Sequence, residues 1–191
     1  MSGQSVLYLA FVLLAVLVAS LERLHAARNE RRLRGRGADE VAPWVFRLMV
    51  PAYAAVFLGA VGEHLLLHRR PPLPLATAAV VLFVASKSLK LWAVLHLGDA
   101  WTMRVFLPRV LRVVTTGPYR YVRHPNYVAV VGEVVAVPLA GGAWITAGAS
   151  VVLFAVILAM RVKTEERALL ARPEYAVAMA SKRRFLPGGG G

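Results

Sequence analysis

Residues 127–160 read YVAVVGEVVAVPLAGGAWITAGASVVLFAVILAM, an apolar stretch that Gly141 and Gly142 divide into two blocks. A membrane-spanning helix needs roughly 17–25 mostly apolar residues, and paired glycines are typical of turns. The stretch therefore predicts two membrane helices that form a short hairpin, with Glu133 and Pro138 interrupting the first and shorter one.

Three further apolar blocks precede this hairpin, at Ser5–Leu21, Trp44–Gly62 and Leu73–Leu97. The chain is 58% hydrophobic, whereas soluble domains are roughly 45–50% apolar. We therefore expect an all-α, polytopic membrane protein with five transmembrane helices. No basic segment precedes the first block, so we expect a retained helix and not a signal peptide.

The formal charge of +13 is distributed unevenly between the two sides of this arrangement. Basic residues are concentrated in 23–36, 104–123 and 161–184, whereas the connection between the second and third blocks holds only Arg69 and Arg70. Basic loops stay in the cytoplasm, so the pattern predicts an outside N-terminus and a cytoplasmic C-terminus. Topology thus explains the charge without nucleic acid, and anionic membrane lipid is an expected partner.

Two kinds of chemistry are excluded or disfavoured by composition. The chain has no cysteine, which excludes disulfides, thiolate metal sites and a cysteine nucleophile. Its five histidines lack a spacing such as His-Glu-x-x-His, so we expect no bound metal.

Charged residues also occur inside the apolar blocks. Lys87 and Lys90 lie on one helical face, where they either snorkel to the headgroups or contact an anionic ligand. Glu133 is a costly intramembrane carboxylate. It either has a functional role facing the protein interior or is hydrogen-bonded to a neighbouring helix.

Residues 117–127 read GPYRYVRHPNY and form a dense polar and aromatic cluster at the predicted membrane border. The segment from 98 to 122 that leads to it is longer than a simple connection between helices needs, and loops of this length are usually functional. Proline is favoured in the first turn of a helix, so His124-Pro125 predicts a helix start. The free amides of that start favour an anionic or polar ligand.

A second polar cluster, Arg161, Glu165 and Glu166, follows the hairpin. The chain between Tyr127 and Arg161 is long enough for two short membrane passes, so both clusters are expected on the cytoplasmic face. Considered alone, Arg161 and Glu165 are one helical turn apart and are compatible with a simple ion pair worth about 0.2–0.5 kcal/mol.

Together with RVKTEE at 161–166, PEY at 173–175 and RFLP at 184–187, the 117–127 segment resembles the signature of the isoprenylcysteine carboxyl methyltransferase family. These integral membrane enzymes transfer a methyl group from S-adenosylmethionine. The resemblance covers roughly residues 96–187, whereas the first 95 residues match only in being hydrophobic.

The resemblance implies S-adenosylmethionine as cofactor and assigns Arg161 to substrate positioning. The positions that match the family's cofactor site are Leu111, Arg112, Val113, Val114, Tyr119, His124, Pro125, Asn126, Tyr127 and Glu165.

Some positions depart from the pattern of eukaryotic members. Asn126 stands where they have a small residue, and Ala129 stands where they have glycine. Trp101-Thr102 and Glu133 look more like bacterial members that methylate lipid-like polyketides such as alkylpyrones and alkylresorcinols.

We therefore expect residues 1–187 to form a single membrane methyltransferase domain, with its matched catalytic part at about 96–187 and a disordered glycine tail at 188–191. The expected activity is O-methylation of an amphiphile, either a prenylcysteine carboxylate or the hydroxyl of a long-chain alkylpyrone or alkylresorcinol. The expected location is a bacterial plasma membrane, with the site facing the cytoplasm. The alternative from another class is a non-catalytic membrane scaffold or transporter.

Overall fold

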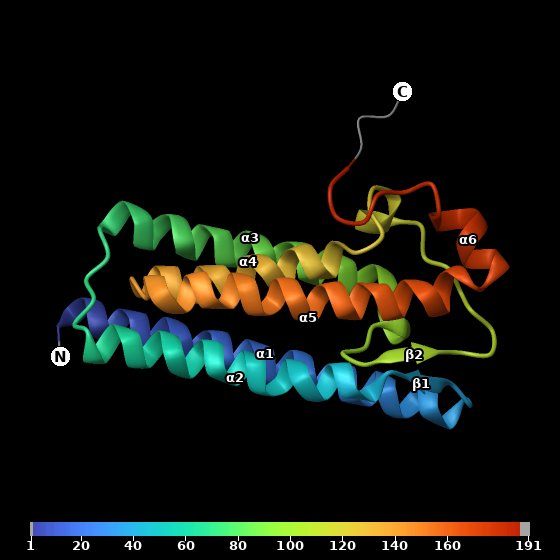
Figure 1. Cartoon of the computed structure of the whole chain (residues 1–191), viewed down its shortest axis with the longest axis horizontal. Helices are drawn as coiled ribbons and strands as arrows, with labels where there is room; N and C mark the ends of the chain where they lie inside the picture. The colour runs from blue at the N-terminus through green and yellow to red at the C-terminus, as the bar shows by residue number, and fades with distance from the viewer. Residues whose placement is uncertain (1, 188–191) are drawn as a thin grey trace.

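A computed structural model describes residues 2–187 as a mostly helical chain (Figure 1). Its elements are α1 (Gly3–Gly35), β1 (Asp39–Val41), α2 (Pro43–Leu66), α3 (Leu73–Leu97), η1 (Gly98–Ala100), β2 (Val105–Leu107), η2 (Gly117–Arg120), α4 (Pro125–Ala140), α5 (Trp144–Leu170) and α6 (Pro173–Met179). The expected glycine tail at 188–191 lies outside the described residues.

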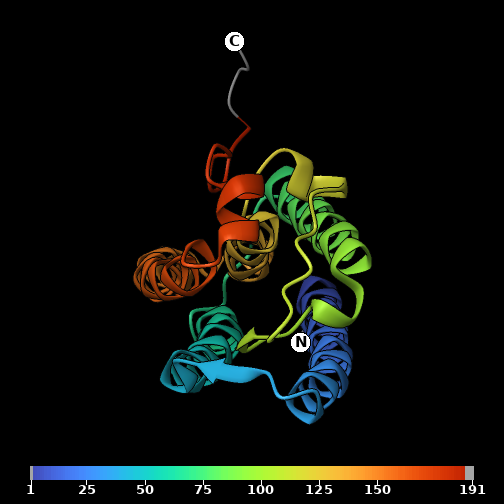
Figure 2. The ribbon, with the colours of Figure 1, turned by 90° about the vertical axis from the view of Figure 1, so that its right-hand side faces the viewer.

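The five long helices run side by side along the long axis of the molecule, and α4 packs against all the others (Figures 1 and 2). Small residues on α4, such as Ala129 and Ala136, are completely buried. A side chain at Gly132 would collide with Ser86 of α3. Small residues let membrane helices approach closely, which explains why α3 and α4 pack most extensively.

Four helical stretches are long and apolar enough to cross a membrane: α1, α2, residues 73–100, and α5. Their outward faces carry exposed leucines and valines, as lipid-facing helices do. The described chain is thus a polytopic α-helical membrane protein. At 16 residues, α4 is shorter than these four, so the fifth membrane passage stays a prediction.

The residues expected to form a long basic loop after the first helix are instead mostly helical. α1 continues beyond Leu21 to Gly35 because this extension has partners. The Arg23 guanidinium lies 3.0 Å from the Glu30 carboxylate, and the Asn29 amide donates to the main-chain carbonyls of Gly98 and Trp101, at 3.2 and 2.9 Å.

The all-α expectation agrees with the mostly helical chain, to which two short strands add one antiparallel pair. β1 and β2 align Asp39 opposite Leu107 and Val41 opposite Val105. Asp39 and Glu40 lie in β1, and α2 begins without a side-chain cap. The strands fasten the start of α2 to the segment that precedes η2.

Both polar clusters lie at the same end of the helical bundle. The ends of α1 and α5, the start of α4, both strands and α6 gather at the right of Figure 1. The turns at 67–72 and 141–143 lie at the opposite end. The fold therefore brings residues 117–127 and 161–166 together.

Candidate active site

The site is built where α4 begins and α5 ends. Pro125 occupies the first turn of α4 directly after His124, which confirms the helix start expected from the His-Pro pair. Upstream, Gly117 has a φ of +59° and faces the ring of His96 so closely that a side chain would collide with it. Only glycine fits this turn without strain, and the turn directs η2 toward the start of α4.

Tyr127 connects two predicted site residues of α5. Arg161 Nε donates a hydrogen bond of 2.7 Å to the Tyr127 hydroxyl, and this hydroxyl donates to the Glu165 carboxylate. The Arg161 guanidinium also lies over the Tyr127 ring, 5.4 Å from its centre. Instead of the direct ion pair that their spacing allows, Arg161 and Glu165 are connected by hydrogen bonds through Tyr127.

Arg161 is a buried cation whose direct polar contacts are a hydroxyl and a sulfur atom. It is 4% exposed, and besides Tyr127 it reaches the Met49 sulfur, 2.9 Å from Nη1. Within residues 2–187 no carboxylate oxygen lies within 4.0 Å of its guanidinium nitrogens. The Glu165 carboxylate is linked to it only through the Tyr127 hydroxyl, although burying a charge without a direct partner costs several kcal/mol.

His124 contacts Glu166, the neighbour of the predicted cofactor residue Glu165. Its Nε2 lies 3.1 Å from Glu166 Oε1, and its ring stacks on that of Tyr127 at 5.2 Å. Arg123 and Arg184 also contact Glu166, at 3.2 and 2.8 Å. Glu166 is thus a functional candidate that the cofactor assignment missed, although its place beside Glu165 in the second cluster was visible in the sequence.

The segment after α6 lies along the residues that precede α4. The amides of Arg123 and His124 donate to the carbonyls of Arg183 and Arg184, at 3.0 and 2.9 Å. The Lys182 ammonium donates to the Tyr119 carbonyl at 2.8 Å. The tail therefore forms one wall of the candidate site.

A second wall is apolar and contains four of the predicted cofactor residues. Tyr119 is buried with Tyr175 and Met179 of α6. Burial and the nearby Glu165 carboxylate raise the pKa of the Tyr119 phenol, which therefore stays protonated and can donate a hydrogen bond at neutral pH. The predicted residues packed against this cluster are Leu111, Val113 and Val114.

The remaining predicted cofactor residues differ in their surroundings. Pro125 is completely buried, whereas Arg112 is exposed. The side-chain oxygen of Asn126 is buried and, within residues 2–187, has no hydrogen-bond partner. Since buried polar atoms normally have partners, this oxygen is available to a donor on a ligand.

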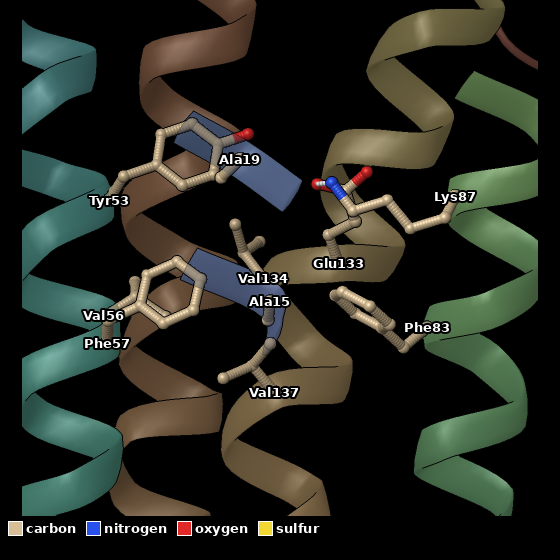
Figure 3. A pocket seen from close by; sticks show the side chains of 10 residues that line it. All are labelled: Ala15, Ala19, Tyr53, Val56, Phe57, Phe83, Lys87, Glu133, Val134 and Val137. Atoms are coloured by element: carbon tan, nitrogen blue, oxygen red, sulfur yellow. Dashed lines mark ion pairs between the residues drawn. The ribbon is translucent and has the colours of Figure 1, made fainter. Parts of the chain in front are cut away.

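Three charged residues of the apolar blocks, Lys87, Lys90 and Glu133, form a group of four with Glu22. Lys87 lies 2.7 Å from Glu22 and 3.1 Å from Glu133, while Lys90 lies 3.2 and 2.7 Å from the same two carboxylates. The lysines therefore do not snorkel to the headgroups. Glu133 contacts the neighbouring helix, as one of its two interpretations stated. A small, mainly apolar pocket beside it faces Tyr53 (Figure 3).

Fold and site together define an α-helical integral membrane protein with its polar residues gathered at one end of the bundle. Residues 78–171, from α3 to the end of α5, match the model of the isoprenylcysteine carboxyl methyltransferase (ICMT) family. The chain belongs to this family and is therefore a membrane methyltransferase. The match begins upstream of the expected residue 96 and includes the two intramembrane lysines.

Two relatives are similar over most of the chain. The uncharacterized protein YpbQ of Bacillus subtilis (strain 168) is 30% identical over 170 residues, which cover 87% of this chain and 98% of YpbQ. An uncharacterized protein of Haemophilus influenzae is 24% identical over 147 residues, covering 74% of this chain and 83% of that protein. The similarity to YpbQ thus extends beyond the segment that matches the family model.

Proposed function

We propose that the protein is an S-adenosylmethionine-dependent O-methyltransferase that acts on an anionic, amphiphilic acceptor at the cytoplasmic surface of a bacterial plasma membrane. The observation that carries this proposal is the buried Arg161, which has no carboxylate partner within the described residues and is fixed by Tyr127. A guanidinium presents parallel donors that match a carboxylate. It therefore suits the carboxylate of a prenylcysteine-like acceptor.

The residues present also fit the cofactor. Leu111, Val113 and Val114 offer an apolar surface, which suits a flat purine ring. Glu165 can accept hydrogen bonds from ribose hydroxyls, and the unpartnered Asn126 oxygen can accept one from an amino group. When bound, the cofactor supplies an electrophilic methyl group on a sulfonium.

The role of the chain's own residues is mainly to position the acceptor. A carboxylate is already ionised at neutral pH, so its oxygen can form the new O–C bond without a general base. Arg161 would hold that oxygen at a fixed place, and Tyr127 would fix Arg161. Attack of an anion on a cation removes two charges, so exclusion of water at this end of the bundle favours it.

An alternative acceptor is the hydroxyl of a long-chain alkylpyrone or alkylresorcinol, which Glu133 and Trp101 favour by their likeness to bacterial members with such substrates. Such a hydroxyl must lose its proton, and a nearby cation lowers the pKa of the acceptor group. In both cases the apolar tail would enter from the bilayer and the soluble cofactor from the cytoplasm.

Purified protein in detergent micelles tests the proposal in two steps. Titration with S-adenosylhomocysteine should show binding that Glu165→Ala and His124→Ala weaken. Absence of binding at millimolar ligand would refute the methyltransferase proposal and favour a scaffold or transporter.

The second step follows labelled methyl transfer to acetyl-farnesyl-cysteine and, separately, to an alkylpyrone. Arg161→Ala should lower the rate more than about tenfold, because a hydrogen bond to a charged group is worth about 1.5–3 kcal/mol, while S-adenosylhomocysteine binding is largely retained. Arg167→Ala is the matched control, since Arg167 is exposed on the same helix. Full turnover by the Arg161 variant would refute its assigned role.

A further inference from the structure

A narrow pocket, too small to hold a water molecule, lies between the paired strands and the start of α2. Arg161 forms part of its wall, and its other lining residues include Glu40 of β1, Phe46 of α2 and Arg104 just before β2. The pocket therefore includes Arg161 but none of the predicted cofactor residues.

Two arginines line this pocket, and within residues 2–187 only one of them has a direct carboxylate partner. Arg161 has no carboxylate partner within 4.0 Å in the described chain, whereas Arg104 Nη1 lies 2.6 Å from Glu40 Oε1. The Arg104 guanidinium also rests on the Phe46 ring, 4.5 Å from its centre. Stacking on an aromatic ring holds a guanidinium in place. Arg104 is thus fixed beside the pocket by a ring and a carboxylate.

Glu40 is the carboxylate among the residues that line this pocket, and a second arginine holds it from outside. Its other oxygen, Oε2, lies 2.7 Å from Arg34 Nη2. Glu40 therefore keeps a cationic partner if Arg104 turns to another anion. Arg104 likewise has a second carboxylate nearby, with Glu30 Oε2 at 3.5 Å from its Nε.

We infer that Arg104 is a second anion-binding residue of the acceptor site and that Glu40 occupies it when no acceptor is bound. The ligand class is an amphiphile with a carboxylate headgroup, which would replace Glu40 at Arg104 while also contacting Arg161. This inference rests on the proposed function and adds to it a reason for preferring a carboxylate to a neutral hydroxyl.

The exchange between Glu40 and the acceptor at Arg104 also favours release of the product. Methylation converts the charged carboxylate into a neutral ester, which has lost its attraction for both arginines. Glu40 is anchored by Arg34 next to the pocket and can pair with Arg104 again. Glu40 therefore competes with the charged substrate for Arg104 and favours departure of the uncharged product.

The test compares binding of acetyl-farnesyl-cysteine with binding of its methyl ester, because the two probes differ by the charge and one methyl group. Direct titration into the full-length protein in micelles measures both, without any requirement for turnover. Arg104→Gln should weaken binding of the acid about tenfold and leave the ester unchanged. Glu40→Gln should tighten the acid several-fold, again without an effect on the ester.

Arg31→Gln serves as the control, since Arg31 is an exposed arginine at the same end of the bundle, and it should change neither probe. The inference is overturned if both variants change the acid and the ester equally, which indicates altered packing, or if the wild-type protein does not distinguish the acid from the ester. S-adenosylhomocysteine binding, measured on the same samples, reports separately on the proposed methyltransferase function.

Discussion

Replacing Tyr127 with phenylalanine removes one oxygen atom from the centre of the candidate site. The hydroxyl accepts from Arg161 Nε and donates to Glu165, so both charged groups lose a partner. The ring remains, and with it the stacking on His124 and the surface over which the Arg161 guanidinium lies. The change therefore isolates the bridging hydrogen bonds.

The magnitude follows from the value of one such bond. A hydrogen bond to a charged group contributes about 1.5–3 kcal/mol, and each 1.4 kcal/mol corresponds to about a factor of ten. We expect kcat/KM of Tyr127→Phe to fall between roughly tenfold and one hundredfold. Most of the loss should reside in kcat, because Arg161 keeps its charge and loses its fixed position.

The assay is labelled methyl transfer to whichever probe acceptor the wild-type protein methylates, with thermal unfolding in micelles measured in parallel. Tyr121→Phe is the control, since Tyr121 is an exposed tyrosine in the same segment and should retain wild-type activity. An unchanged kcat/KM for Tyr127→Phe, or an equal loss in the control, would refute the argument that Tyr127 positions Arg161.

Three further outcomes are expected elsewhere in the chain. Glu166→Gln should weaken S-adenosylhomocysteine binding and speed proteolytic cleavage within residues 181–187, because it removes the charge that attracts the tail; mass spectrometry of the fragments checks this. Glu133→Ala should destabilise the protein by about 3–5 kcal/mol, because it leaves buried lysine charge under-compensated, and adding Lys90→Met should restore part of the loss in thermal unfolding. Gly132→Ala should lower the melting temperature by forcing α3 away from α4, and a second change, Ser86→Ala, should relieve the collision.

The helical membrane fold was predictable from the sequence because apolar blocks of the required length are a strong signal. The end of α1 was not, since the helix continues past Leu21 through contacts with residues distant in the chain, such as Gly98 and Trp101. The paired strands have three residues each, too few for a recognisable alternation. Their pairing depends on the helices that bring residues 39 and 107 together.

For the candidate site, too, the residues could be predicted from a local sequence signature, whereas their contacts with one another could not. The likeness of residues 117–127 and 161–166 to the family signature named Arg161, Tyr127 and Glu165, which the fold brings together. Sequence spacing gave no sign that Tyr127 would separate Arg161 from Glu165. It also gave no sign that the neighbouring Glu166 would contact His124 and the tail.

The pairing of the tail with the segment before α4 has a consequence for biosynthesis. The four helical stretches long enough to cross a membrane precede Arg183 and Arg184 in the chain, so they are synthesised before the tail. The wall beside His124 depends on the carbonyls of those two arginines and is therefore completed only after residues 183 and 184 have left the ribosome. A chain that stops before Arg183 would occupy the membrane without a finished site, so the bilayer would receive it in an inactive form.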